Sequence, residues 1–204
     1  MSRVRTRPTR DETRDKLFEA AARVFEEQGI GSASIEAIAA AAGFSRGAFY
    51  SNFKSKDELI IAMLEDHVER SIERHLGLLA QTENIDDFLN ALKSMDRGKQ
   101  DPIGRAPLLH MEMVLFVARA EKRRPELAKR LRARRKLVTD IIETSLKKSG
   151  QPAAQNAGWT AAILIALEDG FRLHRLIDPE TTTADSFLRA ISDLRRAMGI
   201  IATS

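Results

Sequence analysis

Side chains that can bind another molecule are concentrated in residues 43–59. Ser55 with Glu58 three residues later is a capping box, so a helix is expected to begin there. Lys54 and Lys56 flank that helix start, and the positive N-terminus of a helix with lysines beside it attracts phosphate. The chemistry predicted for this stretch is contact with a phosphate-bearing ligand.

A short helix must present the side chains that precede those lysines. Ser45 can cap a helix in which Phe49 and Phe53 lie four residues apart on one face. We expect the two rings to anchor that face in a core. Arg46 and Tyr50 have no evident internal partner, so the polar face that carries them is expected to be left for a ligand.

Two further helices are expected before this one. Apolar residues recur with helical spacing in residues 11–28, and Gly29 ends that helix. Ser34 caps a short helix over residues 35–42, which Gly43 ends. Short helix, glycine-containing turn and short helix together form the helix-turn-helix pattern. A helix–glycine–helix corner is also common in all-α proteins without DNA-binding function.

Residues 14–64 resemble the TetR family of bacterial transcription regulators through the run EAAARVFEEQGIGSASIEAIAAAAGFSRGAFYSNFKSKDEL. The resemblance implies an all-α fold, with an N-terminal three-helix helix-turn-helix DNA-binding domain followed by a larger helical ligand-binding and dimerisation domain. The expected boundaries are a basic disordered arm at 1–10, the DNA-binding domain at 11–58 and the larger domain at 59–204.

The same resemblance makes residues 45–53 the recognition helix and assigns the contacts with double-stranded DNA. Tyr50, Lys54 and Lys56 take phosphate-contact positions, and lysine and tyrosine suit that role chemically. Arg46 is the leading candidate to read a base, because an arginine can donate to O6 and N7 of guanine. Ala48 departs from the hydroxyl residue common at its position. The implied DNA-binding residues are Ser34, Ser45, Arg46, Gly47, Ala48, Tyr50, Ser51, Asn52, Lys54 and Lys56.

The composition argues against several other kinds of chemistry. The chain of 204 residues has no cysteine, and its four histidines lack the spacing of metal ligands. We expect no cofactor, no metal and no catalytic residue. An all-α enzyme is the alternative, but no Ser/His/Asp order, paired carboxylates or phosphate-binding glycine loop stands out. Without a signal peptide or a run of about 18 uncharged apolar residues, the chain is expected to stay in the cytoplasm and off membranes.

Positive charge is unevenly distributed, although the net charge is only +4. Residues 1–10 contain four arginines and no acid, and residues 122–136 contain nine basic residues and one glutamate. We expect the first cluster to reach DNA and the second to be a solvated helix face. If the second cluster also faces DNA, the alternative is a nucleoid-associated interaction protein that binds DNA without sequence preference.

Further helices are expected along the larger domain. They cover residues 59–80, residues 84–98 and residues 125–148, the last with an inward stripe that includes Leu131. Residues 108–118 are almost continuously apolar, so that segment is expected to be buried.

Two helices near the C-terminus predict a homodimer. Apolar and small residues follow a four-three-four-three-four spacing within residues 156–178, and the final helix repeats four-three-four. Two such helices per chain suit a four-helix interface, and a two-fold dimer requires a pseudo-palindromic operator. The alternative is that both helices pack only within their own subunit. The expected interface residues are Trp159, Ile163, Ala166, Gly170, Leu173, Ile177, Phe187, Ile191, Leu194 and Met198.

The resemblance also implies a small-molecule effector that releases the protein, as a repressor, from its operator. Adaptable and amphipathic side chains in the larger domain are of the kind that line apolar pockets, although a methionine or aromatic residue at helical spacing is, taken singly, more often ordinary core. The candidate effector-binding residues are His67, His110, Met111, Met113, Phe116, Trp159, Phe171 and His174.

Overall fold

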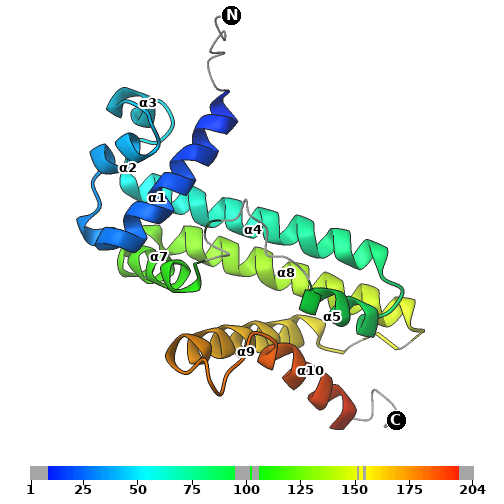
Figure 1. Cartoon of the computed structure of the whole chain (residues 1–204). Helices are drawn as coiled ribbons and strands as arrows, with labels where there is room; N and C mark the ends of the chain where they lie inside the picture. The colour runs from blue at the N-terminus through cyan, green and yellow to red at the C-terminus, as the bar shows by residue number, and fades with distance from the viewer. Residues whose placement is uncertain (1–8, 95–101, 103–105, 151, 154, 198–204) are drawn as a thin grey trace, which may run out of the picture. The chain divides into compact units, whose positions relative to one another are not determined.

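The computed structural model describes residues 9–94, 102, 106–150, 152, 153 and 155–197. Those residues form nine α-helices and one short 3-10 helix with no strand, which confirms the predicted all-α fold. Residues 1–8 of the predicted arm and Met198 of the predicted interface lie outside them. In chain order the helices are α1 (Arg10–Ser32), α2 (Ile35–Ala41), α3 (Arg46–Tyr50), α4 (Lys56–Gln81), α5 (Ile85–Ser94), α7 (Pro107–Arg119), the 3-10 helix η1 (Glu121–Arg123), α8 (Arg124–Lys148), α9 (Ala157–Ile177) and α10 (Ser186–Ala197) (Figure 1).

The described helices divide into two compact units. The first unit contains α1, α2, α3, α4 as far as Val68, α7, η1 and the start of α8 as far as Ala128. The second unit contains α4 from Glu69, α5, α8 from Lys129, α9 and α10. Helix α7 follows residue 59 in the sequence but belongs to the same compact unit as the three N-terminal helices.

Helix α1 begins at a capping box and is interrupted by a glycine. Thr9 Oγ1 accepts a hydrogen bond from the Glu12 backbone N–H at 3.2 Å, and Glu12 Oε2 accepts one from the Thr9 N–H at 2.8 Å. The helix therefore starts at Arg10, which the sequence placed in the arm. Gly29 has a φ of 75°, so the regular helix ends where predicted, and one more turn follows as far as Ser32.

The core of the first unit joins the three N-terminal helices to the start of α4 and to α7. Figure 1 shows α2 and α3 beside α1. The large side chains with 0–1% exposure are apolar and come from all five elements, because each short helix has too little apolar surface to fold alone. They are Leu17, Phe25, Ile38, Phe49, Leu59, Ile60, Met63 and Met113.

Helix α7 is buried on one face only, so the expectation for residues 108–118 is partly wrong. Leu109, Met113 and Val117 recur every four residues and are at most 3% exposed. Leu108 and Leu115 are 58% and 54% exposed. A continuous apolar run does not reveal which side of a helix meets the core, because a helix turns every 3.6 residues.

The second unit has a smaller core of its own. Leu79 of α4, Phe88 and Leu89 of α5, and Leu137 and Ile141 of α8 are each less than 9% exposed. Asn84 caps α5 by accepting hydrogen bonds from two backbone N–H groups, and α10 adds partly buried leucine and isoleucine side chains. Leu137 and Ile141 of the inward stripe that was predicted for residues 125–148 are buried in this core.

One residue of that predicted stripe is misplaced. Leu131 is 49% exposed, whereas Leu137 and Ile141 are buried. At its C-terminus α8 is tied to the end of α4, because Lys148 Nζ donates to the carbonyl oxygens of Leu79 at 2.8 Å and Thr82 at 2.6 Å. The buried apolar residues of α8 in the second unit, Leu137 and Ile141, therefore lie in its C-terminal half.

Candidate nucleic-acid interface

Helices α2 and α3 are each started by a serine and separated by a glycine turn. Ser34 Oγ accepts a hydrogen bond from the Ala37 N–H at 3.0 Å, and Ser45 Oγ accepts one from the Ala48 N–H at 3.2 Å. Gly43 ends α2 with a φ of 73°, a conformation that favours glycine. Both predicted caps and the predicted turn are confirmed, so the segment has helix-turn-helix geometry.

Two phenylalanines anchor α3 as predicted. Phe49 is 0% exposed and Phe53 is 2% exposed, with their ring centroids 5.8 Å apart. Phe53 also stacks on Phe18 of α1 at 5.8 Å. The helix itself ends at Tyr50, so the expectation of a helix through residue 53 was too long. The anchoring fixes which face of α3 is left exposed.

The exposed face of α3 carries an interaction that the sequence did not predict. Arg46 was expected to lack an internal partner, and this is wrong: its Nη1 lies 3.1 Å from Glu36 Oε1 of α2. Its Nη2 donates to the Tyr50 hydroxyl at 3.5 Å, and its guanidinium lies 5.4 Å from the Tyr50 ring centroid. The hydrogen bond with Tyr50 and the charge of Glu36 raise the pKa of Arg46. The side chain remains exposed, at 64%.

The other predicted contact residues in and directly after α3 are small or are hydrogen-bonded to the end of the helix. Ser51 Oγ and Asn52 Nδ2 both donate to the Ala48 carbonyl, at 2.7 Å and 2.9 Å. Gly47 is exposed, and a Cβ atom there would meet only Ser45 Oγ, at 3.8 Å. The backbone of α3 is thus open to close approach at Gly47.

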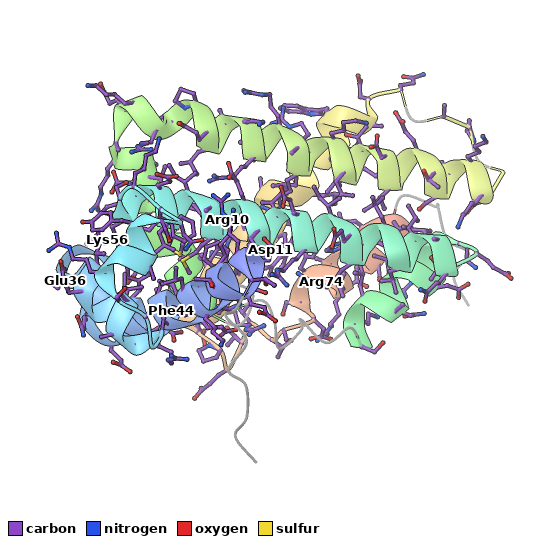
Figure 2. The ribbon with its side chains drawn as sticks, turned by 90° about the horizontal axis from the view of Figure 1, so that it is seen from above. Arg10, Asp11, Glu36, Phe44, Lys56 and Arg74 are labelled. Carbon is purple, nitrogen blue, oxygen red and sulfur yellow. The ribbon has the colours of Figure 1, made fainter. Side chains whose placement is uncertain are left out.

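The start of α4 differs from the predicted capping box in one bond. Ser55 Oγ accepts from the Glu58 N–H at 3.1 Å, but Glu58 Oε2 accepts from the Lys54 N–H at 2.8 Å. Lys54 is exposed. Lys56 Nζ donates to three backbone carbonyl oxygens between residues 30 and 33. Figure 2 labels Lys56 at the start of α4 and Glu36 on α2.

Comparison with known families agrees with this geometry. Residues 17–63 match the family profile described as bacterial regulatory proteins, tetR family. Residues 104–197 match a second profile, described as tetracyclin repressor-like, C-terminal domain. The chain belongs to the TetR family. Members of this family are transcriptional regulators and not enzymes, so the helix-turn-helix of the TetR-family chain is a DNA-binding element.

Individual relatives resemble parts of this TetR-family chain. It is 34% identical over 91 residues to the regulator TtgR of Pseudomonas putida, a match that spans 45% of the chain and 42% of TtgR. It is 25% identical over 162 residues to the regulator UidR of Escherichia coli, a match that spans 78% of the chain and 79% of UidR. The fold matches the crystal structure of FadR from Bacillus subtilis in complex with stearoyl-CoA, with a TM-score of 0.65 and 16% identity. The match covers 88% of this chain and 95% of the FadR chain.

The candidate effector-binding residues of the TetR-family chain are divided between its two units. Five of them lie in the first unit, where the rings of His67 and His110 are 4.9 Å apart. Met113 is fully buried in the core of that unit. In the second unit, Trp159 is 68% exposed, His174 is exposed and Phe171 is half-buried. The effector-binding role of all eight residues stays a prediction.

The residues predicted for the dimer interface form an exposed stripe on α9. Trp159, Ile163, Leu173 and Ile177 are 68%, 52%, 41% and 74% exposed, although all are large and apolar. On α10 the corresponding side chains are less uniform: Leu194 is 51% exposed, whereas Ile191 is partly buried against the core of the second unit. The interface itself stays a prediction.

The second unit also contains a charged cluster that the sequence analysis missed. Arg134 of α8 donates to Glu168 at 2.8 Å and to Asp169 at 2.9 Å, and Arg172 donates to Glu168 at 2.8 Å. Burial tends to raise the pKa of Glu168, but the two guanidinium groups outweigh it and the pKa lies below its ordinary value. Helical spacing could have suggested the Glu168–Arg172 pair, whereas the contact with Arg134 requires the fold.

Neither a membrane span nor a metal site emerges from the described ranges. No helix there is long and apolar enough to cross a membrane. Within the same ranges, no three histidine, aspartate or glutamate side chains gather as a metal-binding group would require.

Proposed function

We propose that this TetR-family regulator is a repressor that binds a pseudo-palindromic DNA operator as a homodimer and is released by a small-molecule effector. The observation that carries the proposal is the face of α3 opposite Phe49 and Phe53, where Arg46, Tyr50 and Gly47 are exposed. A helix anchored on one side and polar on the other can enter the major groove.

Within that proposal, some residues contact the phosphates of the DNA and others contact the edges of its bases. Tyr50, Lys54 and the N-termini of α2 and α3 near Ser34 and Ser45 bind phosphates and set the register of the protein on DNA. Arg46 reads a base edge, and its partners within the protein leave further N–H groups to donate, because a guanidinium has five. Ala48, Ser51, Asn52 and the backbone at Gly47 complete the contact surface.

The exposed stripe on α9 supports the homodimer. Side chains as large as Trp159 and Ile177 are more often buried, and a contiguous apolar strip at helical spacing is typical of a helix–helix interface. Ala166 and Gly170 lie within the strip and permit close approach of a second helix. In a two-fold dimer the paired α3 helices then require two half-sites about 34 Å apart, or a multiple of that distance.

Effector release is proposed from family membership and from the helical region after residue 59. Regulators of this family bind small-molecule effectors, and the FadR structure contains stearoyl-CoA. The region 59–204 is proposed as the ligand-binding and dimerisation domain, with the DNA-binding domain at 11–58. An effector that binds better to an arrangement with separated α3 helices lowers the affinity for DNA.

Selection of bound sequences from random DNA tests the function most directly. Enrichment of a site with two-fold symmetry is expected, and Arg46→Ala is expected to relax the preference at one base of each half-site. Lys54→Ala serves as the matched variant, because loss of a phosphate contact weakens all sequences alike and reduces the salt dependence by about one unit. Absence of any enriched sequence, with equal losses for both variants, would support the nucleoid-associated alternative instead.

A further inference from the structure

The ammonium group of Lys56 lies where three backbone carbonyls converge. Its Nζ donates to Ile30 O at 2.6 Å, Ala33 O at 2.8 Å and Gly31 O at 3.1 Å. These acceptors belong to the turn of α1 that follows the break at Gly29 and to the residue after it. Carbonyls at the end of a helix lack helical partners and carry partial negative charge, so an ammonium group is a suitable ligand for them.

This arrangement uses every donor that Lys56 has. A lysine ammonium has three N–H groups, and the three carbonyls take one each. A phosphate oxygen could be bound only if at least one of these bonds were broken. Lys54, two residues earlier, is exposed, and its side chain has no hydrogen bond or ion pair to the residues that the structure describes.

We propose that Lys56 is a positioning residue for the helix-turn-helix and not a phosphate contact. It joins the first residue of α4 to the residues directly before Ser34, the cap of α2. Both ends of the α2–α3 segment are therefore fixed to each other through one side chain. The inference rests on the proposed DNA-binding function, and it changes the role that the family resemblance implies for this lysine.

The position of the caps explains how a non-contacting lysine affects DNA binding. Ala33 is 2% exposed and its carbonyl is held by Lys56, while the next residue, Ser34, is exposed. A shift of Ala33 would move the N-terminus of α2, which is proposed to lie near a phosphate. Because phosphate contacts set the register, a small displacement there weakens recognition of the specific site more than binding to random DNA.

The test compares Lys56→Met with Lys54→Met, since each substitution removes one positive charge and keeps an unbranched side chain that is only one atom shorter. Without DNA, Lys56→Met is expected to lower the thermal unfolding midpoint by about 4 °C and Lys54→Met to leave it unchanged. Well below that midpoint, Lys56→Met is expected to weaken binding to the selected operator about tenfold, with an unchanged salt slope and a much smaller loss of affinity for random DNA. Lys54→Met is expected to reduce the salt slope by about one unit.

Lys56→Arg separates the two roles even if Lys56→Met fails to fold. Arginine retains the charge and suits phosphate, so a phosphate contact would survive the change. A planar guanidinium cannot direct three N–H groups to converging carbonyls, so the positioning role predicts a lower unfolding midpoint and weaker operator binding. The proposal is overturned if Lys56→Arg behaves as wild type, or if Lys56→Met reduces the salt slope without loss of stability. The unfolding comparison needs no DNA, so it remains decisive for Lys56 even if no operator is found.

Discussion

Glu36 at the start of α2 holds Arg46 at the start of α3, with Oε1 and Nη1 3.1 Å apart. The pair crosses the turn of the helix-turn-helix. Tyr50, one helical turn beyond Arg46, accepts a hydrogen bond from the same guanidinium. An acidic side chain on a surface that is proposed to meet phosphates opposes binding electrostatically. Its presence there is explained if the carboxylate orients the guanidinium that is proposed to read a base.

Removal of this carboxylate should separate affinity from selectivity. Glu36→Gln is expected to raise the affinity for random DNA, because one negative charge is lost, and to reduce discrimination severalfold at the base that Arg46 is proposed to read. Stability should change by less than about 1 kcal/mol, since the pair is exposed. The measurement is binding to the selected operator and to its single-base variants. Glu27→Gln removes the same charge from α1, and equal selectivity losses in the two variants would contradict the orienting role of Glu36.

The apolar stripe on α9 leads to a prediction about assembly. Ile163→Asp is expected to convert the proposed dimer to a monomer at micromolar concentration, because a charge at the centre of an apolar interface costs more than about 2 kcal/mol. Light scattering reports the mass, and operator binding should fall to the level of a single half-site. Leu108→Asp is the control, since Leu108 is similarly exposed but lies on α7. A dimeric Ile163→Asp protein would show that this stripe is not the interface.

Two glycines near α3 should respond to alanine in opposite directions. Gly43 has a φ of 73°, so Gly43→Ala is expected to destabilise the protein by about 1 kcal/mol through backbone strain. Gly47 lies within α3, where a Cβ would make only an ordinary contact with Ser45 Oγ at 3.8 Å, so Gly47→Ala is expected to stabilise by about 0.5–1 kcal/mol. Urea unfolding measures both changes.

The same Gly47 variant tests how closely DNA approaches α3. If the backbone at residue 47 meets the edges of the bases, Gly47→Ala should weaken operator binding despite its higher stability. Unchanged affinity would place the DNA farther from this part of the helix. Gly43→Ala at a temperature where it is folded provides the comparison for altered helix geometry.

The Glu168 cluster predicts a pH-dependent contribution to stability. The pKa of Glu168 is lower in the folded chain than its ordinary value. Such a group stabilises the fold above its unfolded pKa of about 4.3, and this contribution is lost as the pH falls through the folded value. Glu168→Gln is therefore expected to cost about 1 kcal/mol at pH 7, since the carboxylate is partly exposed, and progressively less below pH ~4.

Urea unfolding of Glu168→Gln and wild type across this pH range checks the prediction. Asp193→Asn is the control, because Asp193 forms an exposed pair with Arg196 at 3.2 Å on α10. That variant is expected to match wild type at every pH. A constant difference between wild type and Glu168→Gln from pH 7 to pH 3 would mean that ionisation of the carboxylate is not the source of its effect.

Local signals in the sequence were sufficient for the helices and their ends. Ser34, Ser45, Gly29 and Gly43 act within a few residues of themselves, so capping and positive φ can be predicted without knowledge of the fold. Helical spacing likewise identified Phe49 as a core residue, because that spacing is also a local property of the sequence. The exposed stripe of α9 was also visible as spacing, although spacing alone does not tell an interface from a core.

The partners of individual charged groups depended on tertiary structure. Arg46 and Glu36 are ten residues apart, Lys56 and Ile30 are 26 apart, and Arg134 and Glu168 are 34 apart. No local pattern links such residues, because their contact follows from how the helices pack. The sequence by itself determined the family, the helix-turn-helix and the hydrophobic anchors of α3. Only the fold decided that Lys56 binds the protein's own carbonyls and that Arg46 is held by an acid, since hydrogen-bond partners are set by distances between helices.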